Sequence, residues 1–459
     1  MFGRTTDIIE KKDIQRITDI ERDKSAGSQF FLWFASNLTI GDLALGSLIY
    51  AITGLSFTWM FVSILIGNVL GGTLLALMSV TGPRTGLPQM MIGRISFGEL
   101  GGRVMAFLQW LNSVGWFIFN SVIAASALLI IFEGERAFAP QSPFSGMHQY
   151  LVPIIVAVVV VAFLAFVGQR IIHMFEKLMS AVLGILFVVI LIYIVGNYGF
   201  PSLTTGGFSA VGFGLSVALT FSYIMSWGPY AADYSRYVKE DAPPSSVFLA
   251  TLGGGIIASV FVEIIGYTIA TNISSSSEIS AQIFSILAPL HASIIGLFAI
   301  FLGGMSANAL NLYSNSLSMK SMGIKARRTT IVLYVVLVSI VVSYFLYQNY
   351  YSYFEDFLLL LDYWITPWLG IMIADFFIVR RMRVDLADSK GSAVPALLVY
   401  VSSILVSIPF MNPGYLIVGP LSNYFGGVDI SYFVSFIVAV VLYSTYTLRK
   451  RTVRTSNVV

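Results

Sequence analysis

The 459-residue chain has no cysteine, only three histidines and only 11% charged residues. Without cysteine, disulfides and thiolate metal sites are excluded. The sequence also lacks HExxH, GxSxG and phosphate-loop motifs, so nothing in it indicates the catalytic cluster of an enzyme. The low charge, together with 57% hydrophobic residues, excludes an ordinary soluble domain. What remains is an integral membrane protein that transports, conducts or signals.

Long apolar runs recur along the chain, and each can cross a membrane, which takes roughly 20 residues in a helix. Charged and turn-rich gaps separate twelve predicted spans. They lie at about 29–50, 56–80, 104–131, 151–168, 178–196, 209–230, 246–271, 284–312, 329–347, 357–379, 394–411 and 431–448. We therefore predict an all-α membrane protein with one transmembrane domain (29–449) between two solvated tails, 1–28 and 450–459.

The positive charges predict the orientation of these spans. With the amino terminus inside, 25 of the 26 Lys and Arg residues fall in the tails and in the gaps on the inner side, and only Arg136 falls outside. Short cytoplasmic loops carry such an excess of Lys and Arg. We expect a lipid-embedded, multi-pass protein of the cell membrane with both termini cytoplasmic. The net charge of +3 follows from the same loops and gives no reason to expect nucleic-acid binding.

Two of the predicted spans are interrupted. The first contains the polar stretch 36–42, and the sixth contains Trp227-Gly228-Pro229, where proline removes a backbone donor. Breaks at membrane depth are tolerated where they line a cavity or are buried in protein. Spans one and six hold the same position in two halves of five spans, and an offset of five reverses orientation. We predict a five-plus-five inverted repeat (about 29–197 and 209–380) and two extra helices (about 394–448), although two independent kinks are an alternative.

Polar side chains line the third and eighth predicted spans. Asn112, Trp116 and Asn120 are four residues apart and share one helix face, and Asn308 and Asn311 share another. Ordinary hydrogen bonding between helices would satisfy any one of these amides. As a set on corresponding spans of the two halves, they favour a polar cavity.

Five segments of the chain form a specific pattern together. They are 85–89 with 94–98, 114–117, 227–237, 308–317 and 373–377. These segments, in this order across roughly residues 28–383, resemble the nucleobase:cation symporter family, specifically its purine–cytosine permease branch. The resemblance implies a leucine-transporter-like fold and import of a purine base or cytosine with a cation by alternating access. It argues against an enzyme or a channel.

The resemblance also implies a substrate site. Its members are Trp116, Tyr223, Trp227, Asn120, Asn308 and Asn311. Trp116 is expected to stack on one face of the base, and Trp227, or else Tyr223, on the other. The three Asn residues are expected to read the edge of the base, because an amide offers both a donor and an acceptor. Uracil, allantoin, a hydantoin, thiamine or pyridoxine is an alternative cargo, since one pocket residue can redirect specificity.

The coupling ion is expected near the break in the first span, with Asn37 and Ser306 close to it. Sodium-coupled relatives use two adjacent hydroxyls of the eighth span, but here the pair is Ser306-Ala307, so a proton is favoured over sodium. Asp42 and Glu263 are the candidate proton carriers, because ionisable groups within spans are functional hypotheses by default. A purely structural role for both acids is the alternative. Asp362 and Asp375 are expected toward span ends, and Asp375 in a structural role. No resident cofactor or metal ion is expected, and the sequence identifies no protein partner.

Overall fold

The computed structural model describes residues 14–133, 145–166, 169–203, 207–272, 279–290, 293–346, 349–384, 392–413 and 418–456. Apart from two isolated bridges, the regular structure of this part is helical, as predicted. The α-helices are α1 (Ser28–Asn37), α2 (Ile40–Thr53), α3 (Phe57–Thr85), α4 (Gln89–Glu133), α5 (Ser145–Phe166), α6 (Gln169–Tyr198), α7 (Ala210–Met225), α8 (Ala231–Ser235), α9 (Pro244–Asn272), α10 (Ile279–Leu287), α11 (Ser293–Ser321), α12 (Arg328–Leu346), α13 (Tyr350–Ile373), α14 (Val394–Ser407) and α15 (Ser431–Ser456). Short helices are η1 (Asp19–Glu21), η3 (Gly228–Tyr230), η4 (Ala288–Leu290), the π-helical η6 (Ala374–Val379), η8 (Ile408–Phe410) and η9 (Ser422–Phe425).

Many of these helices suit a membrane. Within the described residues, eight are long and apolar enough to cross one, and the bent pair α1 and α2 makes a ninth when counted as one span. Three shorter apolar helices lie at Tyr150–Val160, Thr330–Leu346 and Val394–Phe410. The expectation of a multi-pass membrane protein is confirmed at this level.

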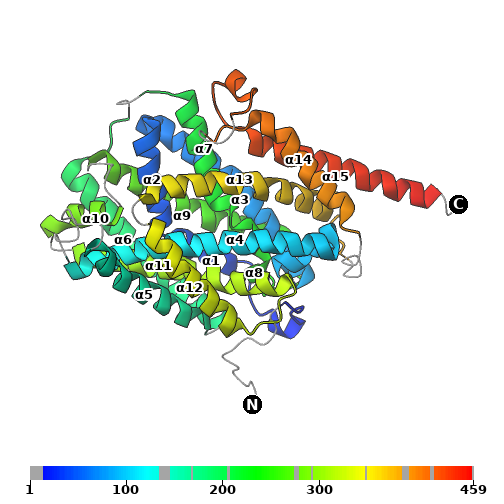
Figure 1. Cartoon of the computed structure of the whole chain (residues 1–459), viewed down its shortest axis with the longest axis horizontal. Helices are drawn as coiled ribbons and strands as arrows, with labels where there is room; N and C mark the ends of the chain where they lie inside the picture. Colours follow the sequence, from blue (N-terminus) through cyan, green and yellow to red (C-terminus); the bar gives the residue numbers. More distant parts are fainter. Residues whose placement is uncertain are drawn as a thin grey trace, which may run out of the picture.

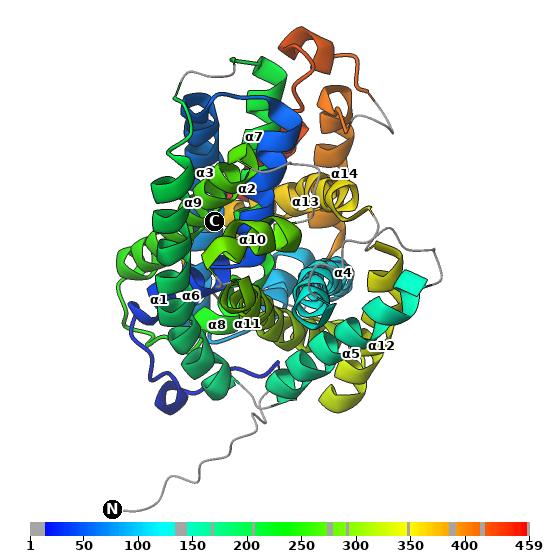
Figure 2. The ribbon, with the colours of Figure 1, turned by 90° about the vertical axis from the view of Figure 1, so that its left-hand side faces the viewer.

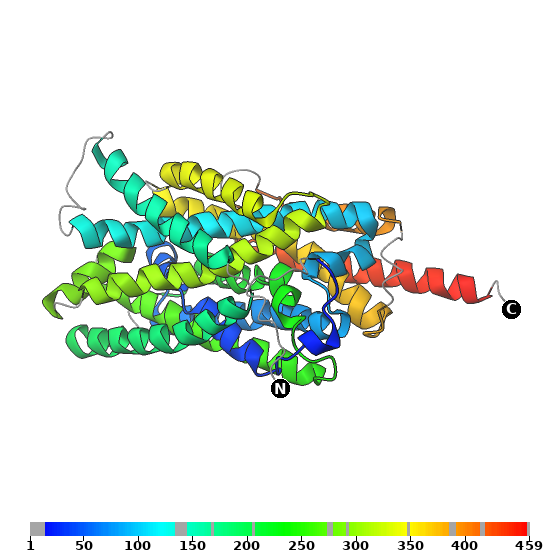
Figure 3. The ribbon, with the colours of Figure 1, turned by 90° about the horizontal axis from the view of Figure 1, so that it is seen from below.

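The helices pack in groups around the centre of the molecule. One group joins α1, α2, α3, α7, α8 and α9, and a second joins α4, α5, α11 and α12. Figure 2 shows α5 and α12 side by side on the outer side of α4 and α11. A third group, α13 to α15, contacts α7 through α13 and contacts α4 through both α13 and α14. The end of α15 projects beyond the other helices (Figures 1 and 3).

Two glycines bring α2 and α9 into backbone contact. A Cβ atom added to Gly46 would lie 1.9 Å from the carbonyl oxygen of Glu263, and one added to Gly266 would lie 2.0 Å from that of Leu43. Only glycine permits so close an approach between helices. The contact therefore sets the spacing between Asp42 on α2 and Glu263 on α9.

Several helix boundaries differ from the predicted spans, and two of these differences have a clear cause in the sequence. α4 begins at Gln89 rather than near 104, because a first helical segment joins the span through a kink at Gly98. The backbone there (φ 64°, ψ −177°) is open essentially to glycine alone. The predicted span 284–312 is divided, since α10 ends at Leu287 and α11 begins at Ser293. Pro289 explains the division, because it cannot donate to the preceding turn.

Two residues of the solvated tail expected for 1–28, Ile17 and Arg22, are buried against the helices, whereas most of the segment 14–27 is exposed. Arg22 is only 3% exposed. Its guanidinium donates to the carbonyl oxygen of Pro83 at 2.9 Å and to the carboxylate of Glu240 at 2.8 Å. A buried guanidinium needs such partners, so the segment is fixed to the end of α3 and to the loop after α8. Residues 1–13 lie outside the described residues.

Candidate functional site

The break predicted in the first span is present. α1 ends at Asn37, Leu38 leaves the helical conformation (φ −81°, ψ 60°), and α2 starts at Ile40, bent by 52° from α1. The Thr39 hydroxyl caps α2 by accepting from the backbone N–H of Asp42 at 3.5 Å. The Thr39 side chain thus pairs with a backbone N–H group at the start of α2, which an apolar side chain would leave without a partner.

The break predicted in the sixth span is also present, and it lies against the first. α7 ends at Met225, and the 3-10 turn η3 separates it from α8. Trp227 Nε1 donates to Asn37 Oδ1 at 3.2 Å, and the hydroxyls of Tyr223 and Thr39 lie 2.8 Å apart. Two interruptions that are about 190 residues apart in the chain therefore meet in space.

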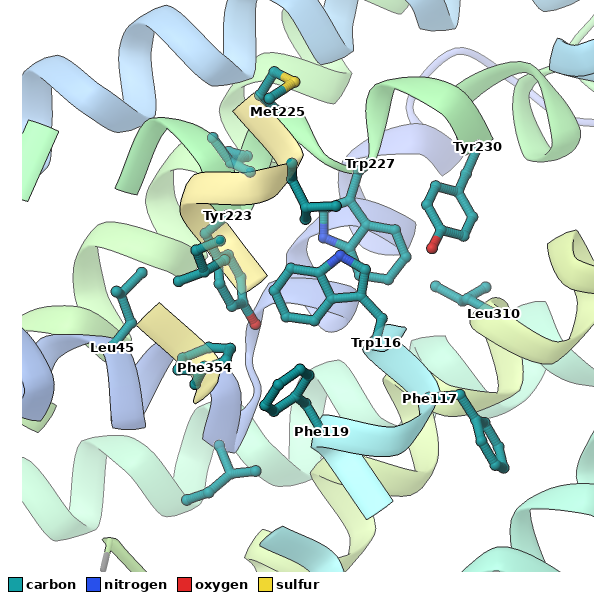
Figure 4. Close-up of a cluster of buried hydrophobic side chains, with 14 of the residues drawn as sticks. Leu45, Trp116, Phe117, Phe119, Tyr223, Met225, Trp227, Tyr230, Leu310 and Phe354 are labelled. Carbon is teal, nitrogen blue, oxygen red and sulfur yellow. The ribbon is translucent and has the colours of Figure 1, made fainter. Parts of the chain in front are cut away.

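Trp116 on α4 faces the sixth-span break. Its ring centroid lies 5.0 Å from that of Tyr223, with the planes at 81°, and 5.4 Å from that of Phe357, at 78°. Trp227 packs against Tyr230, with centroids 5.2 Å apart. Figure 4 shows these residues of α4, α7 and η3 converging on one region. All the aromatic rings that pair with Trp116 within the described residues are nearly perpendicular to it. None of them stacks parallel to Trp116, which is the geometry expected for a bound base.

Asn308 on α11 holds the other two predicted amides. Its Nδ2 donates to the carbonyl oxygen of Phe117 and to the hydroxyl of Ser121, each at 3.0 Å. Its Oδ1 accepts from Asn120 Nδ2 at 3.3 Å and from Asn311 Nδ2 at 3.2 Å. Asn308 is thus occupied within the protein and orients its two neighbours. Asn311 Oδ1 is buried and has no hydrogen-bond partner in the described part of the chain, which leaves it free to accept from a ligand.

Asn37 and Ser306 lie where a cation site was expected. The Asn37 amide is used at both ends, since Nδ2 donates to a backbone carbonyl one turn earlier at 2.7 Å and Oδ1 accepts from Trp227. Ser306 is fully buried on α11. Gly303, one turn before Ser306, faces the first break, since an added Cβ would lie 3.5 Å from the carbonyl oxygen of Leu38. The structure thus brings α11 beside the break, with Ser306 on the same helix face as Gly303.

Asp42 and Glu263 are fully buried and close enough to repel each other when both are charged. One oxygen of Asp42 accepts from the Thr39 hydroxyl at 3.2 Å, and one oxygen of Glu263 accepts from Asn68 Nδ2 at 2.7 Å. The second oxygen of each carboxyl group has no hydrogen-bond partner among the described residues. Two like charges side by side away from water repel strongly. The pair is therefore suited to hold one positive charge.

The family assignment follows from a match over most of the chain. Residues 16–435 match the model of a family described as permeases for cytosine and purines, uracil, thiamine and allantoin. The chain belongs to this permease family. It is accordingly a transporter rather than an enzyme.

The permease has relatives in bacteria and fungi. It is 28% identical to the candidate purine-cytosine permease YxlA of Bacillus subtilis (strain 168), over 96% of both proteins. It is 25% identical to the purine-cytosine permease fcyB of Emericella nidulans, over 95% of this chain and 87% of fcyB. Among solved structures, it is similar to Mhp1, a nucleobase-cation-symport-1 family transporter, in a closed conformation with bromovinylhydantoin bound. The TM-score is 0.76 at 20% identity, over 96% of this chain and 95% of Mhp1, so the permease shares the Mhp1 fold.

Some residues at the site were not predicted from the sequence. Phe354 and Phe357 on α13 pack against Trp116, with centroids 6.0 and 5.4 Å away. A signal was present in Gly115, next to the tryptophan, because an added Cβ would lie 2.4 Å from the Phe357 ring. Asn68, which holds Glu263, carried no comparable signal, since a single amide in an apolar span does not reveal its partner.

Asp362 of the permease differs from its expected place toward a span end. α13 starts at Tyr350 rather than near 357, so Asp362 lies in the middle of the helix and is 1% exposed. Neither carboxyl oxygen has a hydrogen-bond partner in the described ranges. Asp375, by contrast, has the structural role expected of it, because Arg380 Nε donates to its carboxylate at 2.7 Å.

Proposed function

We propose that this permease imports a purine nucleobase or cytosine together with a cation, by alternating access. The observation that carries the proposal is the meeting of the two helix breaks beside Trp116, between α1, α4, α7 and α11. Broken helices facing each other at a repeat interface are where transporters of this architecture bind substrate and ion. The names of the purine-cytosine permeases among its relatives agree with this cargo.

Within that site, we assign the ring face of the base to Trp116, with an aromatic of the sixth span on its other side. Trp227 and Tyr223 both lie there, and each is bonded to a residue of the first break. Asn311 and Asn120 read one edge of the base, while Asn308 holds both in position. A planar ring between aromatic faces gains apolar burial and about 0.5–1.5 kcal/mol per ring pair beyond that burial.

Thermal unfolding of the purified permease with a panel of bases tests this cargo. A ligand that binds only the folded state stabilises it by an amount set by its concentration relative to its dissociation constant. Adenine, hypoxanthine, guanine or cytosine is expected to raise the unfolding temperature. Uptake into proteoliposomes, with counterflow of preloaded base, then distinguishes a carrier from a channel. Absence of any shift with these bases contradicts the proposal.

The family description also names uracil, thiamine and allantoin, so these compounds are the alternative cargoes. Each of these compounds carries a ring that can lie against an aromatic side chain, and the edge contacts decide between them. The same unfolding experiment, extended to uracil, thiamine, allantoin, a hydantoin and pyridoxine, separates the alternatives. A shift with one of these alone keeps the fold and replaces the cargo.

For the ion, we infer that the permease couples transport to a proton held by the Asp42–Glu263 pair rather than to sodium. Support comes from the two free carboxyl oxygens and from Ala307, which provides no hydroxyl ligand beside Ser306. Uptake driven by an imposed proton gradient in sodium-free buffer is the expected result. Uptake that requires sodium and persists with a proton uncoupler assigns the ion to the Asn37 and Ser306 region instead.

We also infer twelve spans in a five-plus-five inverted repeat with two extra helices, both termini being cytoplasmic. The nine candidate spans and the three shorter apolar helices support the count. Contacts between basic segments support the orientation, since Arg94 donates to the carbonyl of Ser321 and Arg380 to that of Ile95. These contacts agree with the prediction that the inner loops lie together at one end. A reporter that is active only in the cytoplasm should be active when it is fused to the carboxyl terminus, and one that is active only outside the cytoplasm should be inactive there.

A further inference from the structure

Three buried polar side chains near the sixth-span break have hydrogen-bonding atoms that remain unpaired within the described residues. Gln109 and Asn112 lie on α4, and Tyr230 lies in η3. They are 0%, 1% and 0% exposed. Gln109 Nε2, Asn112 Oδ1 and the Tyr230 hydroxyl have no hydrogen-bond partner within the ranges that the structure describes. Natural proteins rarely bury a donor or an acceptor without a partner, and a ligand is one way to complete it.

The contacts that these side chains do make determine which atoms are left over. Asn112 Nδ2 donates to Gln109 Oε1 at 3.1 Å and to the carbonyl oxygen of Ser226 at 3.3 Å. Gln109 therefore has its nitrogen free, and Asn112 has its oxygen free. The two amides together present one donor and one acceptor. The Tyr230 hydroxyl lies beside the Gln109 amide without the geometry of a hydrogen bond.

These atoms lie at the proposed substrate site. Gln109, Asn112 and Trp116 are spaced by three and four residues, so they share one face of α4. Ser226, which anchors Asn112, belongs to the break after α7. Tyr230 packs on Trp227, and Figure 4 shows both rings near Trp116. The unpaired acceptor and donor thus lie on the Trp116 face of α4, one and two turns before the ring on which a base is expected to stack.

A neighbouring donor and acceptor match the edge of a nucleobase. Adenine and cytosine present an amino group next to a ring nitrogen, and hypoxanthine and guanine present a carbonyl oxygen next to a ring N–H. Each edge offers one donor beside one acceptor, so the same protein pair satisfies either kind when the base is turned over. The Asn120, Asn308 and Asn311 group is a separate set on the other side of Trp116 along α4, and it is largely occupied by its own hydrogen bonds.

We propose that Gln109 and Asn112 read the hydrogen-bonding edge of the bound base and that the Tyr230 hydroxyl completes the same site. Asn311 then serves the opposite edge. This inference rests on the proposed function and adds the residues that set specificity within it. A site built to pair with a polar edge rejects analogues that lack that edge, because its own buried groups then stay unpaired.

The test compares adenine with 1-deazaadenine, which keeps the amino group but has a carbon in place of the adjacent ring nitrogen, the atom to which the free Gln109 nitrogen would donate. Apparent dissociation constants are measured by thermal stabilisation of the full-length purified permease. The wild type is expected to prefer adenine. Gln109→Met, which keeps the length of the side chain and removes its amide, is expected to reduce that preference about three- to tenfold, as for one lost hydrogen bond. Binding of 1-deazaadenine itself should change less.

A matched control is Gln29→Met. Gln29 on α1 is fully buried, and its amide is likewise unpaired in the described part of the chain. It lies outside the α4 face, so the ratio of adenine to 1-deazaadenine affinity should be unchanged. If Gln109→Met does not fold, Gln109→Asn replaces it in the test. Its side chain is one methylene shorter, so the amide nitrogen no longer reaches the base, and the same loss of preference is expected.

The outcomes separate this inference from the proposed function. A wild type that no base stabilises overturns both. A wild type that prefers adenine, with Gln109 variants that keep the full preference, overturns the inference alone. A loss of adenine preference in the Gln109 variants, but not in the Gln29 control, supports it.

Discussion

Replacing Asn308 by alanine is expected to destabilise the permease far more than replacing Asn311, although both are buried amides one turn apart on α11. Asn308 takes part in four hydrogen bonds, two as donor and two as acceptor. Asn311 takes part in one, as donor, and its oxygen is unpaired within the described residues. The prediction therefore separates a residue that holds the site from one that faces the ligand.

The magnitude follows from those bonds. A hydrogen bond contributes about 1 kcal/mol net in soluble proteins and about 0.6 kcal/mol between membrane helices. Asn308→Ala should therefore cost about 2–4 kcal/mol, and Asn311→Ala about 0.6–1 kcal/mol. Asn308→Ala also leaves the Nδ2 groups of Asn120 and Asn311 without their acceptor, which adds to the first cost.

Unfolding of the purified variants in detergent, without ligand, measures the difference. Base binding, measured separately, should be weakened in both variants, because Asn308 positions the groups that Asn311 and Asn120 present. Equal stability of the two variants would refute the reasoning, since it would mean that the hydrogen bonds around Asn308 do not hold α4 to α11.

Trp116→Ala is expected to abolish uptake while the protein still reaches the membrane; near-normal uptake in cells would remove stacking from the mechanism. Glu263→Gln should keep counterflow but lose concentrative uptake under a proton gradient, and retained accumulation would exclude this acid as the carrier. Gly46→Ala should destabilise the permease by about 1–3 kcal/mol or more in thermal unfolding, because the added Cβ would collide with the backbone of α9. Gly196→Ala is the control and should not destabilise it, because its Cβ would have no atom within 4 Å. Asp362→Leu should stabilise the permease against denaturation by about 1–3 kcal/mol, because it removes buried oxygens without a partner. A less stable variant would show that this acid has a partner.

Local features of the sequence were enough to predict both helix breaks. Pro229 cannot donate a backbone hydrogen bond, and the polar run 36–42 cannot be buried as an ordinary apolar helix, whatever surrounds them. The helical class and the faces of the third and eighth spans were predictable for the same reason. The spacing that puts Asn112, Trp116 and Asn120 on one face is a property of the helix alone.

The partners of the polar groups were not predictable, because they depend on how far one helix is shifted along another. Nothing in the sequence shows that Asn308 would bind Asn120, while Gln109 and Asn112 would keep free atoms. The Asn68 bond to Glu263 depends on the packing of α3 and α9, and the burial of Arg22 depends on a segment outside the spans. Pro289, in contrast, was a visible signal for the division between α10 and α11.

The glycine contact between α2 and α9 makes the two helices a single rigid piece. Because backbone touches backbone at Gly46 and Gly266, the helices cannot come closer, and sliding would force each Cα past a carbonyl oxygen. We therefore expect the spacing between Asp42 and Glu263 to be kept when other helices move. In the proton-coupled mechanism proposed above, the charge on the pair changes, and its effect reaches other parts of the molecule through the groups that hydrogen-bond to the pair. Those groups are the Thr39 hydroxyl at one break and the Asn68 amide on α3, so a rigid acid pair would act on movable partners.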